Sequence, residues 1–254
     1  MADPGPSERS GHPADGPAFY ALPGGGWRDY WTLLHPPYTV WHLSYVVLGA
    51  CVAPQLRVRW LVETAAAFFL AMGVAAHALD ELHDRPLGTR IPDAALVSLA
   101  VVGLAAAVAL GLDGAAEISP WIWAFIVAGA ILVPAYNLEW FGGALHCDLW
   151  FALAWGAFPA LTAGFAQGGR LTPAIVLMGA ACATLSAAQR TLSTPVRHLR
   201  RRVADVSGTL TLYDGSRQPL DAASLRSAPE RALRWMSLAM PLVAFALLLA
   251  RLTD

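Results

Sequence analysis

Charged residues are scarce in this chain, and lysine is missing altogether. Asp, Glu, Lys and Arg make up 14% of the 254 residues, whereas an average soluble domain has about 25%. Hydrophobic residues make up 56% of the chain, so too few polar side chains remain to cover a water-facing surface. The formal net charge of −1 excludes bulk electrostatic attraction to a polyanion, and we therefore expect no nucleic-acid partner.

Cysteine is also scarce and lacks any paired spacing. Cys51, Cys147 and Cys182 lie in or beside apolar stretches and form no CxxC motif. A free cysteine in such a setting behaves as a small hydrophobic residue, so we predict packing roles and no disulfide framework. All 17 basic residues are arginine, and alanine is abundant, which indicates a GC-rich bacterial genome.

The N-terminal segment has no apolar run. Residues 1–20 are rich in Pro, Gly, Asp and Ser, which argues against a secretory signal peptide and predicts a disordered tail over residues 1–30. Trp27, Tyr30 and Trp31 are suited to an interfacial segment that leads into a first membrane span.

Seven apolar stretches follow, each long enough or nearly long enough to cross a bilayer. A spanning helix needs roughly 20 mostly apolar residues. The stretches are 38–55, 59–80, 93–112, 118–136, 147–166, 172–189 and 232–250. We therefore predict an all-α fold, a polytopic transmembrane helical bundle of about seven spans that forms one domain over residues 31–254.

The arginines give this bundle an orientation. With the N-terminus inside, four arginines fall on the outer side, and the remaining thirteen of the 17 fall on the inner side. The outer four are Arg57, Arg59, Arg170 and Arg251. The positive-inside rule favours this arrangement. We expect a multi-pass protein of the bacterial cytoplasmic membrane with a cytoplasmic N-terminus, so the lipid bilayer is an expected partner.

The only large loop covers residues 190–231, on the inner side. Its first part, "STPVRHLRRRVADV", predicts a basic interfacial helix that begins at a Ser or Thr cap. The next part, "GTLTLYDGSRQPL", alternates polar and apolar residues and predicts a small hairpin that turns at Asp214-Gly215.

The stretch "AHALDELHDRPLGTR" concentrates charge at the end of the second apolar run, over residues 76–90. Four of its side chains fall within about a 100° sector of a helix, namely His77, Asp80, Glu81 and Asp84. The two aspartates are i,i+4 neighbours with Cβ atoms roughly 6 Å apart, so both carboxylates can share a hard cation such as Mg²⁺. Ionisable residues on one face of a span indicate a water-filled cavity, here open to the cytoplasm. The alternative is that the span ends near His77 and the rest is a solvated loop.

Several motifs occur in an order that resembles the UbiA superfamily of intramembrane prenyltransferases. DxxxD at 80–84, followed by "RPLGTRIP", looks like the first aspartate-rich motif of that family, with Ala76 and His77 where the family usually has Asn-Asp. "HPPYTVWHLSYVVLGA" resembles the family's first span. "YNLEWFGGALHCDLWFALAWGAFPALTAGF" resembles its fourth loop and fifth span, with Asp148 in register. The resemblance covers about residues 35–190.

This resemblance implies a helical bundle around a central cavity open to the cytoplasm and the lipid. In such enzymes Mg²⁺ bridges aspartates and an allylic diphosphate, so that the C–O bond ionises and an apolar or aromatic acceptor captures the allylic cation. For this chain it implies an isoprenoid diphosphate as substrate and Mg²⁺ as cofactor. It also implies that Asp80 and Asp84 bind the metal and that Asp80, Asp84 and Asp148 are catalytic.

We expect substrate contacts from polar residues beside the DxxxD motif and at the inner end of the fourth span. These residues are His77, Arg85, Arg90, Tyr136 and Asn137. For Tyr136 and Asn137, helix capping or lipid headgroup contact explains the position equally well.

Arginines follow the sixth span, where the UbiA family has a second aspartate-rich motif. Guanidinium groups bind phosphate oxygens directly and often bidentately, without a metal. We therefore expect Arg190, Arg197 and Arg201 to bind the substrate. On a helix, Arg197, Arg200 and Arg201 would share a face that closes over the cavity mouth, and Arg202 would point away. The alternative is that these arginines only set the topology and contact lipid.

Three functions follow from these patterns. The first is an enzyme that acts on an isoprenoid diphosphate by prenyl transfer or cyclisation. The second is a membrane metalloenzyme with a redox metal bound by His77, Glu81, His83 and His146. The third is a non-catalytic UbiA-like protein that binds a lipid or a partner through the arginine-rich loop.

Some polar and aromatic residues of the spans have simpler explanations. We expect His42 to be a hydrogen-bonded core histidine and Glu63 to pair with Arg59, four residues earlier, near the outer surface. Trp150 or Trp155 could line the cavity, where its π face would stabilise a cation.

The predicted topology can be tested by cysteine labelling. In a background without the native cysteines, single cysteines at Gly88 and Ser216 should react with a membrane-impermeant reagent only after the cells are opened, because both loops are predicted to be cytoplasmic. Labelling of either position on intact cells would overturn the orientation.

Overall fold

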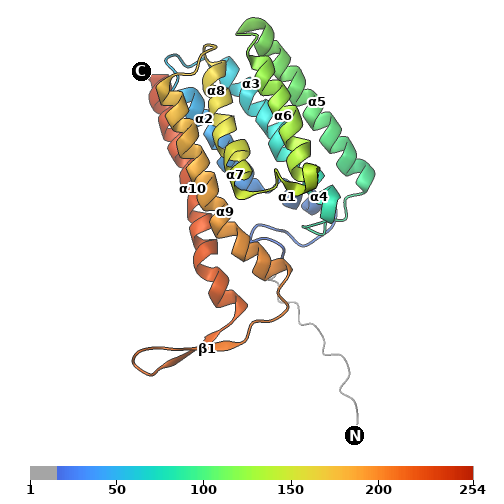
Figure 1. The fold of residues 1–254 in the computed structure, drawn as a ribbon, viewed down its shortest axis with the longest axis vertical. Coiled ribbons are helices and arrows are strands. Elements are labelled where there is room, and N and C mark those ends of the chain that lie inside the picture. The colour runs from blue at the N-terminus through green and yellow to red at the C-terminus, as the bar shows by residue number, and fades with distance from the viewer. Residues whose placement is uncertain (1–15, 254) are drawn as a thin grey trace.

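The structure is a computed structural model that describes residues 16–253, and it is almost entirely helical (Figure 1). Most of the helices run along one common direction. Their bounds are α1 Trp27–Leu33, α2 Pro36–Cys51, α3 Val58–Phe68, η1 Phe69–Ala76, α4 His77–Asp84, α5 Asp93–Glu117, α6 Ile122–Asn137, η2 Trp140–Gly143, α7 Asp148–Phe151, η3 Ala152–Ala157, α8 Phe158–Ala166, α9 Pro173–Arg201 and α10 Ala222–Thr253.

The predicted all-α bundle is confirmed, and each of the seven predicted apolar stretches falls largely within a helix. Within residues 16–253, five helices are long and apolar enough to cross a membrane. They are Val58–Asp84, Asp93–Glu117, Asp148–Ala166, Pro173–Arg201 and Ala222–Thr253. Helix α6 is apolar but shorter, and α2 has 16 residues. The fold is therefore a helical bundle with several helices that could cross a membrane, and the count of seven spans stays a prediction.

The helices pack in two groups that meet along the bundle. Helices α2, α8, α9 and α10 contact one another on one side, whereas α3, η1, α5 and α6 form the other (Figure 1). α9 and α10 continue past the remaining helices as an antiparallel pair. We call this end of the bundle the hairpin end.

Small residues allow the backbones to approach closely where the helices cross. A Cβ atom built on Gly49 of α2 would lie 2.0 Å from the Ala160 carbonyl oxygen of α8. One built on Gly156 of η3 would lie 2.6 Å from the Cys182 carbonyl oxygen of α9. Small residues are the usual means of packing helices tightly in a membrane, where burial of apolar surface supplies little driving force.

The basic helix predicted within residues 190–231 is not a separate element. α9 begins at residue 173, with Thr172 as N-cap and proline at the first helical position. It then continues through Pro195 to Arg201 without a new start. The Ser and Thr residues before the arginines are therefore helix-interior residues, because a proline inside a helix need not end it when the flanking turns pack against neighbours. The last helix, α10, starts at Ala222, ten residues before the predicted seventh span.

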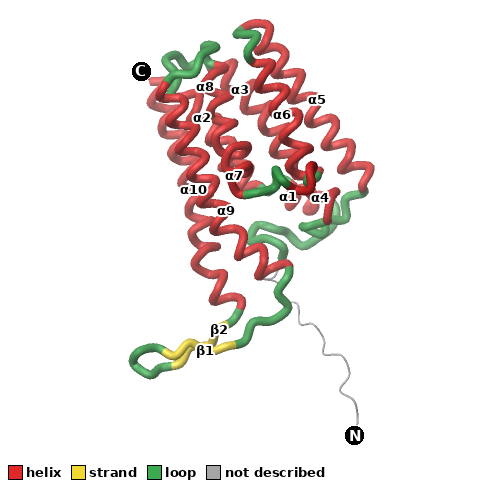
Figure 2. The backbone as a smooth tube through the Cα atoms, viewed as in Figure 1, coloured by secondary structure: helices red, strands yellow, loops and turns green. Residues whose placement is uncertain are grey.

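The predicted hairpin is confirmed. β1 (Gly208–Thr211) pairs antiparallel with β2 (Arg217–Leu220), so that Thr209 lies opposite Pro219. The turn contains Gly215 at a φ of 84°, a left-handed conformation that glycine adopts without strain. Figure 2 shows the two strands beyond the ends of α9 and α10, away from the bundle.

The N-terminal segment lies against the hairpin end. Residues 1–15 of the predicted tail lie outside the described residues. Residues 16–26 contact α9 and the start of α2, and α1 begins before the expected boundary at residue 30. α1 exposes Trp27, Tyr30 and Trp31, as expected for an interfacial helix.

The loops predicted to be cytoplasmic lie together at the hairpin end, and the predicted outer arginines lie at the opposite end. There Arg59 forms ion pairs with Glu63, Asp113 and Glu117, so the predicted Arg59–Glu63 pair is confirmed. Arg251 donates to the Ala53 carbonyl oxygen at 3.0 Å. The two sets are therefore separated by the length of the bundle, whichever end faces the cytoplasm.

Gly49→Ala should destabilise the bundle, because the added Cβ atom meets backbone atoms that cannot rotate away. Overpacking of this kind costs about 1–3 kcal/mol, so the midpoint of thermal unfolding in detergent should fall by several degrees. Gly168→Ala is the matched control, since nothing lies within 4 Å of a Cβ atom there. Equal midpoints for the two variants would contradict the close helix crossing.

Candidate functional site at the hairpin end

The helix that carries the DxxxD motif does not end at His77. A π-helical segment, η1, passes into α4, which continues to Asp84, so residues 77–84 are helical and not a loop. His77 Nδ1 lies 3.0 Å from the Gly73 carbonyl oxygen. Asp80 is partly buried and Asp84 is exposed, and no ion pair of either aspartate is found within residues 16–253.

Glu81 does not face the same space as the two aspartates. Its side chain is buried, with 0% exposed, and its carboxylate accepts hydrogen bonds from Leu87 N, Thr89 N and Thr89 Oγ1 at 2.8–2.9 Å. Glu81 therefore holds the loop after α4 in place. The prediction of four side chains lining one cavity is wrong at this residue, because the loop folds back and supplies three donors to it.

Arg85 and Arg90 also belong to this loop. The Arg85 guanidinium donates to the Ile91 carbonyl oxygen at 2.7 Å and pairs with Asp93. Arg90 is exposed, and its backbone N–H donates to Asp29 of α1. The structure thus gives Arg85 partners in the loop and at the start of α5, and it does not bring either guanidinium to Asp80.

Three predicted site residues from different parts of the chain do come together. Arg190 of α9 donates to the Tyr136 hydroxyl at 2.5 Å and to the Asp148 carboxylate at 2.6 Å. The Arg190 guanidinium also lies over the Phe151 ring, 5.2 Å from its centroid. The Tyr136 ring contacts the Trp155 ring at a centroid distance of 4.4 Å. We call these five residues the Arg190 cluster.

His146 joins the same cluster, although it and Asp148 would lie on different faces of a regular helix. Its ring stacks on Tyr136 at 4.5 Å, and its Nδ1 lies 3.1 Å from the Tyr136 carbonyl oxygen. His146 and Asp148 can both lie near Tyr136 because α7 begins only at Asp148, whereas His146 lies in the turn before that helix. Asn137 is buried and donates to the Val133 carbonyl oxygen, one turn earlier in its own helix.

The arginines at the end of α9 divide into two groups. Arg200 pairs with Glu230 of α10 in a buried contact, so the predicted shared face of three arginines is wrong at Arg200. Arg197 and Arg201 instead favour the charged form of the Asp80 carboxylate of α4. Arg202 is exposed, as predicted.

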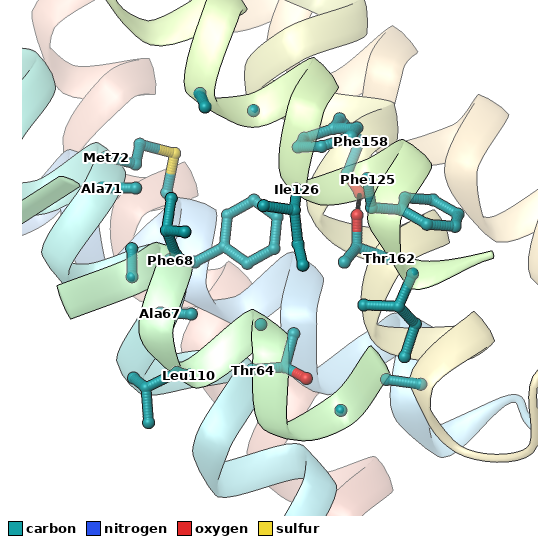
Figure 3. Close-up of a pocket in the computed structure, with 18 of the residues that line it drawn as sticks. Thr64, Ala67, Phe68, Ala71, Met72, Leu110, Phe125, Ile126, Phe158 and Thr162 are labelled. Carbon is teal, nitrogen blue, oxygen red and sulfur yellow. Dashed lines mark hydrogen bonds between the residues drawn. The ribbon is translucent and has the colours of Figure 1, made fainter. Parts of the chain in front are cut away.

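An apolar cavity of about 130 Å³ lies between α3, η1, α5, α6, η3 and α8. Figure 3 shows Phe68, Phe125, Ile126 and Phe158 gathered around it. It extends along α5 from Leu104 to Gly114, ten residues or about 15 Å at the rise of an α-helix. None of the predicted site residues lines it. This cavity is therefore apolar, and the predicted cavity that opens to the cytoplasm beside the DxxxD motif stays a prediction.

Trp155 connects this cavity with the Arg190 cluster. It lines the cavity and contacts Tyr136, whose hydroxyl is bonded to Arg190. A cationic and aromatic cluster is thus joined, through one indole ring, to an elongated apolar space. An amphiphile with an anionic headgroup and an apolar tail matches this arrangement.

The structure also places His35 and Tyr20 at the hairpin end, and neither residue is among the predicted site residues. The Tyr20 hydroxyl lies 2.5 Å from His35 Nδ1, and the His35 ring stacks on His77 at 4.3 Å. Burial lowers the pKa of His35 well below its usual value, and the nearby His77, Arg201 and Arg197 lower it further. Burial, and next Tyr38, raise the pKa of Tyr20. In the sequence, His35 belongs to the "HPPY" stretch, a pattern that indicates the start of a span and does not indicate a site.

The described residues contain no group of three or more His, Cys, Asp or Glu side chains placed to hold a metal ion. This finding removes support from the redox metalloenzyme with His77, Glu81, His83 and His146 as ligands. His42 instead bonds Gln189 at 3.0 Å within the core, as expected.

A scan against protein-family models found no match, and searches of curated proteins and of solved structures found no significant similarity. UbiA membership therefore stays a prediction.

Glu81→Gln should destabilise the loop after α4, because an amide in place of the carboxylate retains only one acceptor oxygen for three donors. Loss of a buried hydrogen-bonded charge predicts a cost of about 1–3 kcal/mol, seen as a lower thermal midpoint and faster proteolysis within residues 85–91. Asp84→Asn, at an exposed position on the same helix, should leave both unchanged. If the two variants behave alike, Glu81 does not anchor the loop.

Proposed function

We propose that the chain is a UbiA-like intramembrane enzyme that acts on an isoprenoid diphosphate, by prenyl transfer or by cyclisation. The observation that carries the proposal is that Trp155 both lines the apolar cavity and contacts Tyr136 of the Arg190 cluster. The headgroup would lie at the hairpin end, and the isoprenoid tail would enter the cavity. The setting would be a bacterial cytoplasmic membrane with the hairpin end and the N-terminus in the cytoplasm.

The cavity suits an isoprenoid tail for physical reasons. Nearly all of its lining is aliphatic or aromatic, and it is elongated along the helices. Apolar walls exclude water, which would otherwise capture a carbocation before the intended nucleophile does. The rings of Tyr136, Phe151 and Trp155 lie between the arginine and the cavity, where their π faces can stabilise positive charge that develops on the tail.

Asp80 and Asp84 fit a Mg²⁺ ion that shares its coordination with a ligand. They lie one turn apart on α4, one partly buried and one exposed. Mg²⁺ is typically held by one or two carboxylates together with phosphate oxygens and waters, so two aspartates suffice only when the diphosphate is present. When bound, the metal would neutralise charge on the departing diphosphate.

Arg190 would bind a phosphate oxygen while Asp148 and Tyr136 hold its guanidinium in place. The allylic C–O bond breaks, and its electron pair leaves with the diphosphate. An apolar or aromatic acceptor, or a double bond of the same isoprenoid, would supply the electrons of the new carbon–carbon bond and would lose a proton to the released diphosphate.

A second candidate is a non-catalytic UbiA-like protein that binds a phosphorylated lipid or a partner. Two observations favour it: residues 16–253 contain no group of three or more His, Cys, Asp or Glu side chains placed to hold a metal ion, and arginines gather at the end of α9. It uses the same headgroup contacts and the same cavity, and it lacks only the bond-breaking step.

The enzyme can be tested directly. Purified protein in detergent, incubated with Mg²⁺ and prenyl diphosphates of several lengths, should release inorganic diphosphate. Asp80→Asn and Asp84→Asn should each lower the rate by roughly a hundredfold, because the developing charge on the leaving group loses its neutralising partner. Arg190→Ala should weaken binding of the diphosphate.

Asp205→Asn is the control, since Asp205 is an exposed carboxylate outside the helices. It should retain the wild-type rate. Tight binding without any release of diphosphate would favour the non-catalytic candidate. Absence of both binding and release would overturn the proposal.

A further inference from the structure

The histidine pair at the hairpin end contains a buried donor without an acceptor. The Gly73 carbonyl oxygen can only accept, so the proton of His77 is on Nδ1. The Tyr20 hydroxyl has no other acceptor within residues 16–253, so it donates to His35 Nδ1. The proton of the neutral His35 ring is then on Nε2, and this atom is buried without a hydrogen-bond partner in the described part of the chain.

Two guanidinium groups act on the His35 ring, and neither forms an ion pair within residues 16–253. Arg197 and Arg201 act electrostatically on both Tyr20 and His35. Among the described residues, Arg197 bonds only Thr194, and Arg201 bonds only the Pro17 carbonyl oxygen. Their neighbour Arg200 differs, because it is paired with Glu230.

The balance of charges around these groups favours an anion. The two like-charged guanidinium groups repel each other, and the carboxylates that act on Arg201 are Asp80 and Glu81. Glu81 is already bonded to the loop after α4. A buried N–H donor left unbonded is costly, commonly by more than a hydrogen bond contributes. One phosphate group, with several acceptor oxygens and negative charge, would satisfy all three donors together.

We propose that His35, Arg197 and Arg201 form a phosphate-binding site that needs no metal. The inference rests on the proposed function for its ligand, since it assigns the site to the diphosphate headgroup. Tyr20 is a positioning residue, because its hydroxyl directs the His35 proton to Nε2. Segment 16–26 brings Tyr20 to the site, which is therefore complete only when that segment lies against α2 and α9.

Metal-free titration of the full chain in detergent tests this site. With EDTA present, inorganic diphosphate and farnesyl diphosphate should both bind the wild-type protein. Arg197→Gln and Arg201→Gln should each weaken binding about tenfold or more, the usual size of a lost hydrogen bond to a charged group. Arg202→Gln is the matched control, because Arg202 is exposed beside the same helix end, and it should bind as the wild type does.

Two variants of His35 distinguish the effect of its Nε2 hydrogen-bond donor from the effect of its size. His35→Gln places an amide nitrogen near the position of Nε2 and should retain most of the affinity. His35→Asn tolerates the left-handed backbone at this position, φ 47°, but its shorter amide cannot reach, so affinity should fall about tenfold. Tyr20→Phe keeps the ring against Tyr38 and should weaken binding about threefold while changing the ¹⁵N shifts of the His35 ring.

Each outcome decides the proposal. Diphosphate that binds only with Mg²⁺, and that responds to Asp80→Asn but not to the His35 and arginine variants, would overturn the metal-free site and leave the proposed enzyme intact. Metal-free binding that depends on the three residues, without release of diphosphate in the enzyme assay, would keep the site and overturn the enzyme.

Binding to anionic vesicles distinguishes a lipid phosphate headgroup from free diphosphate as the ligand. Equal, small and salt-dependent losses of binding to anionic vesicles in the Arg197, Arg201 and Arg202 variants, without binding of free diphosphate, would reduce the arginines to a membrane-surface patch and overturn the site. If a variant fails to fold, the wild-type ¹⁵N spectrum decides, because diphosphate added with EDTA must shift the His35 Nε2 signal.

Discussion

The contact of three helices through small residues determines the rest of the arrangement. α2 meets α8 where Gly49 lies on Ala160, and η3 meets α9 where Gly156 lies on the Cys182 carbonyl group. Neither contact has room for a larger side chain. Because these helices gain little from burial of apolar surface in lipid, close backbone packing is what keeps them in one register.

That register explains the Arg190 cluster. The helix that starts with Asp148 and α9 run in opposite directions and cross at Gly156 and Cys182. Asp148 lies eight residues before Gly156, and Arg190 lies eight residues after Cys182, so both are about two helical turns from the crossing on the same side. An ion pair between residues 42 apart in sequence is thus a direct result of where two small residues meet.

The two π-helical segments have a related role. Phe69–Ala76 and Ala152–Ala157 lie in the two helices that carry the predicted aspartates. Met72 of the first and Trp155 of the second both line the apolar cavity. A π-helical turn is wider than an α-helical one and commonly marks a functional site. Here the wider turns lie where the cavity approaches the polar residues of the hairpin end.

The pattern of apolar stretches, the Asp-Gly turn and the uneven arginines were enough to predict the helical bundle, the hairpin and the grouping of basic residues at one end. Local chemistry governs each of these features: spans need length and hydropathy, and a turn needs its glycine. Which polar side chains meet was decided only by the tertiary structure. Glu81 belongs to a loop because the chain folds back over it, and Arg200 belongs to α10 because Glu230 lies opposite. His35 belongs to the proposed phosphate site because segment 16–26 places Tyr20 against its ring. Such contacts depend on tertiary packing, which no local sequence pattern encodes.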